Sequence, residues 1–188
     1  YSNNIFIYRL EDIYKVTIHE LIHLLKYDKN FYINNNKLIN IYNKRYNINI
    51  KDIKLYESYT ELWANIYHIY FISKFIKKDN NKFFNLLLSI EKEYAIILAQ
   101  KILSLKLNKN INKYTNVLEY FIIRGEYYLN FDKYQKDLLI ILNNGDLDCI
   151  FNQKLDKIKI NKDIIKKLKN YKELYESLSM ILIRLQPS

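Results

Sequence analysis

Two of the three histidines in this chain lie in one short segment, VTIHELIHLL, which runs from Val16 to Leu25. His19 and His23 are four residues apart, and on a helix this spacing places both side chains on one face, one turn apart. Both rings could therefore reach a single Zn²⁺ at about 2.0–2.1 Å. Glu20 is rotated by about 100° from His19, so it would reach a metal-bound water as a general base instead of binding the metal. The H-E-x-x-H spacing thus predicts a zinc site with an adjacent base.

The residues around the two histidines are uncharged, as expected for a helix buried beneath a cleft: Val16, Thr17, Ile18, Leu21, Ile22, Leu24 and Leu25. Two histidines and a glutamate in such a helix would be costly to bury without a polar partner or a metal ion. A fortuitous motif or a metal-free remnant is the alternative interpretation of this segment.

The segment resembles the active-site helix of zincin metallopeptidases. Metzincins continue with a glycine three residues after the second histidine and a third histidine three residues later. Lys26 and Lys29 occupy those positions here, which excludes that branch. Gluzincins instead take a glutamate from a second helix downstream, and the stretch YESYTELWANIYH, residues 56–68, lies where that helix is expected.

Two glutamates in this stretch, Glu57 and Glu61, are candidates for the third zinc ligand. In gluzincins the ligand glutamate is often followed by a small residue three positions later and a polar residue four positions later. Ala64 and Asn65 stand at these positions after Glu61, and TELWAN resembles the glutamate helix of anthrax lethal-factor-like peptidases. We therefore expect Glu61 to be the ligand. The alternative is Glu57 as the ligand, with Glu61 four residues later as its outer partner.

The resemblance implies a zinc-dependent peptidase with Glu20 as the general base, and it also implies a donor to the transition state. Lethal-factor-like enzymes use a tyrosine seven residues before the ligand glutamate, where this chain has Lys54. Tyr56 or Tyr59 would have to replace it. His68, two helical turns beyond Glu61, is a third candidate donor, although a histidine there could also simply pack between helices.

The low content of turn-forming residues indicates a mainly α fold. The chain has two glycines and one proline in 188 residues, too few for a many-stranded sheet. Apolar spacing predicts helices over residues 11–27, 52–77, 82–107, 115–129, 133–145 and 162–185, and the asparagine-rich stretch from Asn34 predicts a loop with a short helix. We expect one zincin-like helical domain over residues 1–188, with at most a short N-terminal strand, IFIY, or a small sheet.

The formal net charge of +10 arises mainly from lysine and allows an acidic partner. We expect a peptide or protein substrate, with acidic substrates attracted by the lysines. A catalytically inactive zincin-like interaction module and a basic helical nucleic-acid-binding protein are the alternatives. Nucleic acid is not the expected partner, because arginines are few and no nucleic-acid motif occurs. The single cysteine, Cys149, and the lack of a leader or a membrane-length apolar run predict an intracellular, cytoplasmic protein.

Overall fold

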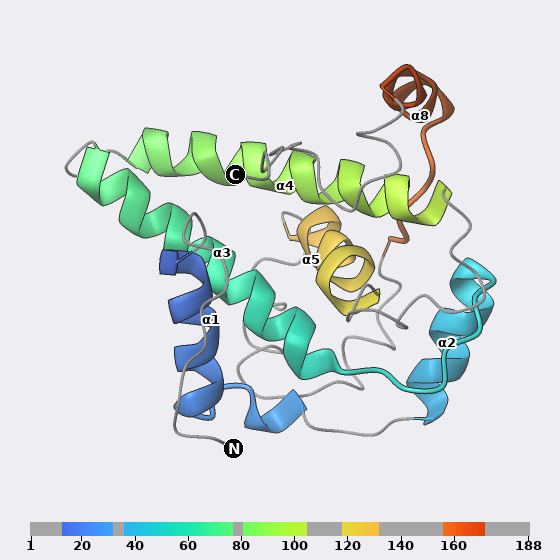
Figure 1. Ribbon diagram of the computed structural model, residues 1–188, viewed down its shortest axis with the longest axis horizontal. Helices are drawn as coiled ribbons and strands as arrows, with labels where there is room; N and C mark the ends of the chain where they lie inside the picture. The colour runs from blue at the N-terminus through green and yellow to red at the C-terminus, as the bar shows by residue number, and fades with distance from the viewer. Residues whose placement is uncertain (1–12, 32–35, 77–80, 105–117, 132–155, 172–188) are drawn as a thin grey trace, which may run out of the picture.

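The computed structural model describes residues 13–31, 36–76, 81–104, 118–131 and 156–171, and in these ranges the protein is mainly helical (Figure 1). The predicted mainly α fold class is confirmed, and the described ranges contain no strand. The predicted IFIY strand, the predicted helix 133–145 and Cys149 lie outside the described residues. The elements are α1 (Ile13–Leu24), η2 (Lys29–Phe31), α2 (Asn36–Tyr46), α3 (Leu55–Ile76), α4 (Asn81–Ser104), η3 (Leu118–Ile123), α5 (Arg124–Asn130) and α8 (Lys162–Lys169).

The two longest described helices are α3 and α4. They contain 22 and 24 residues and agree with the predicted helices 52–77 and 82–107 to within three residues at each described end. Figure 1 shows α5 in the angle between α3 and α4, and α1 against the side of α3. Because α1 contains both motif histidines and α3 contains both candidate glutamates, this packing brings the two halves of the predicted site together.

The helix predicted over residues 115–129 is present from residue 118 but has two parts. Its first six described residues form the π-helix η3, and α5 continues from Arg124. Gly125, the second residue of α5, has a packing role. A Cβ at position 125 would lie 2.8 Å from Cβ of Ala99 and 3.4 Å from the carbonyl oxygen of Ala95. Gly125 therefore allows α5 to approach the backbone of α4 closely.

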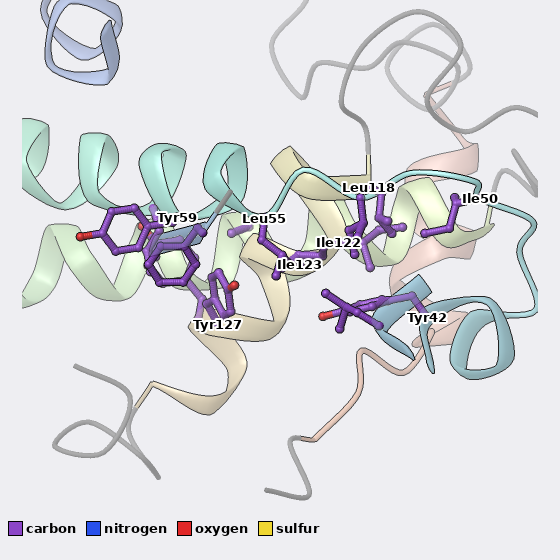
Figure 2. Packing of buried hydrophobic residues seen from close by; sticks show 14 of the residues in the cluster. Tyr42, Ile50, Leu55, Tyr59, Leu118, Ile122, Ile123 and Tyr127 are labelled. Carbon is purple, nitrogen blue, oxygen red and sulfur yellow. The ribbon is translucent and has the colours of Figure 1, made fainter. Parts of the chain in front are cut away.

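The hydrophobic core lies where α2, α3, η3 and α5 meet (Figure 2). Leu55 at the start of α3 and Leu118 and Ile122 of η3 are completely buried. Burial of each such side chain contributes roughly 1.5–3 kcal/mol to folding. Tyr42 of α2 donates a 2.7 Å hydrogen bond to the buried carboxylate of Glu126 in α5. The core thus fixes η3 and α5 beside the first turns of α3.

A left-handed residue ends α1 and reverses the chain. Lys26 has φ 57°, its N–H donates to the carbonyl of His23, and the N–H of Tyr27 donates to the carbonyl of Ile22. This pattern is a Schellman motif, which usually has glycine at the left-handed position. The reversal directs Asp28, two residues after Lys26, back toward the last turn of α1, where it is 1% exposed.

The asparagine-rich stretch from Asn34 contains a helix of 11 residues, α2. Asn47 ends α2 in a left-handed conformation, with φ 52°. The side chain of Asn43 then holds the following segment by accepting from the N–H of Ile50 and donating to its carbonyl. These contacts lead the chain back to the start of α3.

The last described helix, α8, begins at Lys162 as predicted and ends at Lys169, while residues 172–185 of the predicted helix lie outside the described part. The side chain of Asn161 caps α8 by accepting from the N–H groups of Asp163 and Ile164. Among the described residues, no helix combines the length and the apolar character needed to cross a membrane.

Candidate metal centre

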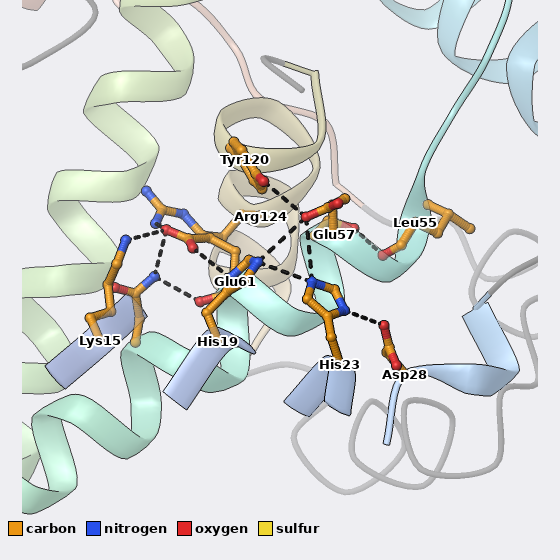
Figure 3. A network of polar contacts seen from close by, with 11 residues as sticks. Lys15, His19, His23, Asp28, Leu55, Glu57, Glu61, Tyr120 and Arg124 are labelled. Carbon is orange, nitrogen blue, oxygen red and sulfur yellow. Dashed lines mark hydrogen bonds and ion pairs between the residues drawn. The ribbon is translucent and has the colours of Figure 1, made fainter. Parts of the chain in front are cut away.

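Three potential ligand atoms converge between α1 and α3 (Figure 3). Nε2 of His19 and Nε2 of His23 are 3.1 Å apart, and Oε2 of Glu57 lies 3.5 Å from the first nitrogen and 3.7 Å from the second. Ligand atoms bound at about 2.0–2.1 Å to a tetrahedral zinc ion lie about 3.3–3.4 Å from one another. The separations of these three atoms therefore fit a single metal ion.

The other ring nitrogen of His23 meets a buried carboxylate. Nδ1 of His23 is 2.6 Å from Oδ2 of Asp28, the residue that follows the reversal at the end of α1. A carboxylate that accepts from Nδ1–H fixes the ring orientation and leaves the Nε2 lone pair for a metal. Asp28 would therefore orient His23 for binding a metal ion through Nε2.

The other ring nitrogen of His19 also meets a carboxylate, that of Glu61. Nδ1 of His19 is 3.3 Å from Oε2 of Glu61. Oε1 of the same carboxylate accepts from Nζ of Lys15 at 2.8 Å and from Nη1 of Arg124 at 3.0 Å. Of the two candidate glutamates, Glu57 thus lies beside the two Nε2 atoms, and Glu61 lies on the opposite side of the His19 ring.

Tyr120 of η3 also reaches the site. Its hydroxyl donates a 2.9 Å hydrogen bond to Oε2 of Glu57, and its ring centroid lies 6.2 Å from that of His19. The carboxylate of Glu119, the residue before Tyr120, accepts from the backbone N–H of Lys54, which directly precedes α3. This contact fixes η3 against α3 and brings a hydroxyl to the candidate ligand atoms.

Histidines and carboxylates stabilise each other's charged forms in this site. Burial lowers the pKa of His23, but hydrogen bonds to Asp28 and Glu57 outweigh this effect and raise it to about 9. Burial also opposes a charged His19, yet Glu57 and Glu61 raise its pKa. Burial raises the pKa of Glu57, but hydrogen bonds from His19, His23 and Tyr120 lower it to about 2. A divalent cation would replace the protons of the histidines in this anionic environment.

The other predicted residues have different surroundings. Glu20 directly follows His19 on α1 and is partly buried. The ring of Tyr56 lies 5.9 Å from that of His23. Tyr59 is 7% exposed and stacks on Phe31 in the core, with ring centroids 4.4 Å apart.

His68 lies eleven residues beyond Glu57 on the continuous helix α3. At a rise of about 1.5 Å per residue, the two α-carbons are about 16 Å apart along the axis. The structure therefore does not bring His68 to the three ligand atoms.

Four residues of the site were not predicted from the sequence: Lys15, Asp28, Tyr120 and Arg124. Asp28 had a local signal, because an acidic residue just beyond a helix with a histidine in its last turn can fold back onto that histidine. Tyr120 and Arg124 are each 63 positions from the glutamate that they contact. No local pattern relates residues at such separations.

No protein-family model matches this chain, and no curated protein or solved structure is significantly similar to it.

Proposed function

We propose that this protein is a zinc-dependent metallopeptidase in which His19, His23 and Glu57 hold the metal. The convergence of two histidine Nε2 atoms and one carboxylate oxygen, with separations of 3.1–3.7 Å, is the observation that carries the proposal. The H-E-x-x-H spacing on α1 supports it, since that motif pairs two zinc ligands with a general base.

The choice of Glu57 over Glu61 as the ligand rests on which histidine nitrogen each carboxylate faces. Zinc-binding histidines usually direct their second ring nitrogen to a carboxylate or carbonyl. Glu61 and Asp28 supply such carboxylates to Nδ1 of His19 and His23. With both Nδ1 atoms engaged, the two Nε2 atoms are directed to the metal, and Glu57 is the carboxylate on that side. This assignment follows the alternative ligand set, with Glu61 as the outer partner.

Separate residues of the chain would carry out the proton transfers and stabilise the transition state of hydrolysis. Zinc, when bound, lowers the pKa of a coordinated water toward about 7 and polarises a carbonyl group. Glu20 accepts the proton of the attacking water as the new carbon–oxygen bond forms, and it returns that proton to the amine nitrogen as the carbon–nitrogen bond breaks. Tyr120 donates a hydrogen bond to the carbonyl oxygen as negative charge develops there.

Zinc content by elemental analysis tests the site, in the wild-type protein beside Glu57→Ala and Glu61→Ala. We expect about one zinc per chain in the wild type, loss of zinc in Glu57→Ala, and affinity weakened about 10–100-fold in Glu61→Ala. Glu93→Ala, which removes an exposed carboxylate from α4, is the control and should keep full zinc. Loss of zinc in Glu61→Ala alone would reverse the ligand assignment. A wild-type protein that binds no zinc would overturn the proposal.

Hydrolysis needs a second test, because zinc binding alone would also suit an inactive interaction module. Glu20→Gln should keep the zinc and lose about 10²–10⁴-fold in the rate of peptide cleavage, because the amide cannot accept the proton. A peptide library read out by mass spectrometry supplies the substrates. Equal cleavage by wild type and Glu20→Gln would contradict the peptidase mechanism.

A further inference from the structure

The carboxylate of Glu61 is held from three elements of the chain (Figure 3). Its Oε1 accepts from Lys15 of α1, from Arg124 of α5, and more distantly, at 3.3 Å, from Asn65 one turn later on α3. Its Oε2 faces Nδ1 of His19 at 3.3 Å. One oxygen is thus held by two cations and an amide, and the other contacts a candidate metal ligand.

Because the site is buried, the orientation of the Glu61 carboxylate depends on its two cationic partners. Glu61 is 8% exposed and Arg124 is 4% exposed, so water cannot easily replace a lost partner. Burying a charge without a partner is costly, and a buried carboxylate freed from its cations would turn toward the nearest remaining positive charge. At this site that charge would be the metal ion, which Glu57 is proposed to bind.

The two cations come from different directions and restrict the carboxylate more than either could alone. Lys15 lies on α1, one turn before His19, so it couples Glu61 to the helix that contains the histidines. Arg124 is the first residue of α5 and also lies 3.8 Å from Glu91 of α4. Its guanidinium therefore links Glu61 of α3 to Glu91 of α4.

We propose that Lys15 and Arg124 are positioning residues of the metal centre. By holding Oε1 of Glu61, they keep its Oε2 on Nδ1 of His19, which presents Nε2 of His19 to the metal and leaves the third ligand position to Glu57. The inference rests on the proposed zinc site and explains why one of two glutamates on the same helix face becomes a ligand and the other does not.

Zinc affinity of the full chain, measured by competition with a chelator of known affinity, tests this role without reference to activity. Arg124→Gln should weaken zinc binding about 10–100-fold, as removal of an outer partner of a ligand histidine does. Arg124→Lys, which keeps a cation, should recover part of the loss. Lys44→Gln removes an exposed positive charge from α2 and should bind zinc as the wild type does.

The tautomer of His19 distinguishes positioning from a general structural effect. In the zinc-loaded wild type, ¹⁵N–¹H correlation spectra should show the proton of His19 on Nδ1. In Arg124→Gln this signal should weaken or split, while the His23 signal, supported by Asp28, stays unchanged. If Arg124→Gln does not fold, Lys15→Met provides the same test, because the Lys15 side chain is 20% exposed and is less important for packing.

The outcomes separate this inference from the proposed function. A wild-type chain without zinc affinity would overturn both. Wild-type zinc affinity and an unchanged His19 tautomer in both Arg124→Gln and Lys15→Met would overturn only the role of the two cations. Weakened affinity together with a displaced His19 proton would support it.

Discussion

At the scale of single residues, each ring nitrogen of the two histidines in the site faces a carboxylate. Glu61 and Asp28 face the Nδ1 atoms, and Glu57 faces the Nε2 atoms. Glu57 and Glu61 lie one turn apart on the same helix. Their surroundings differ, because Glu61 lies beside Lys15 and Arg124, whereas Glu57 accepts from the hydroxyl of Tyr120.

Tyr120→Phe tests the role of that hydroxyl. We expect the variant to keep its zinc and its fold and to lose about 10²–10³-fold in kcat, as expected for removal of one donor to a developing oxyanion. KM should change little. The measurement is steady-state cleavage of a peptide that the wild type hydrolyses, with Tyr171→Phe, an exposed tyrosine, as the control. If the proposed peptidase activity is present, full kcat in the Tyr120→Phe variant would show that the hydroxyl only orients Glu57.

At the scale of elements, the site depends on the close packing of α5 against α4, which holds Arg124 and η3 in place. Gly125 permits this packing because a side chain there would meet Ala99 at 2.8 Å. Alanine is intrinsically better than glycine inside a helix by about 1 kcal/mol. The tight contact should outweigh this preference, because Cβ of Ala99 belongs to a short side chain that cannot turn aside.

Gly125→Ala should therefore lower the free energy of unfolding by about 1–3 kcal/mol, the usual cost of overpacking a close contact. Urea denaturation followed by circular dichroism measures the change. Zinc affinity should fall in the same variant, since Arg124 precedes the displaced residue. A more stable Gly125→Ala protein would mean that helix propensity dominates and that α4 can move away at little cost.

At the scale of the whole molecule, the shifted pKa values of the site residues make the stability of the metal-free protein depend on pH. The pKa of His23 is raised from 6.5 to about 9, so its contribution to stability is complete below pH 6.5 and is lost as the pH rises to about 9. The pKa of Glu57 is lowered from 4.5 to about 2, so its contribution is complete above pH 4.5 and is lost as the pH falls to about 2.

Both contributions are complete together only between about pH 4.5 and 6.5. We therefore expect the melting temperature of the protein in chelator to fall on either side of this window as far as these groups determine it. Asp28→Asn should flatten the alkaline side, because it removes the first of the partners that raise the pKa of His23. Thermal melts at a series of pH values measure both effects, and identical alkaline slopes for the two proteins would contradict the assignment to His23.

The sequence by itself determined the helical character of this protein and the core of its candidate site. The scarcity of glycine and proline and the apolar spacing predicted the long helices, because both are local properties of the chain. His19, Glu20 and His23 were found in the same way, since four-residue spacing has a direct meaning on a helix.

Only the tertiary structure decided which contacts the residues around the two histidines make. Glu57 and Glu61 have the same local geometry, and sequence reasoning preferred Glu61 from its neighbours Ala64 and Asn65. The packing of α1 on α3 decided which nitrogen of His19 each carboxylate faces, and α5 supplied the arginine that holds one of them. Such contacts depend on how helices dock, and docking brings together residues that are far apart in the chain and have no shared local pattern.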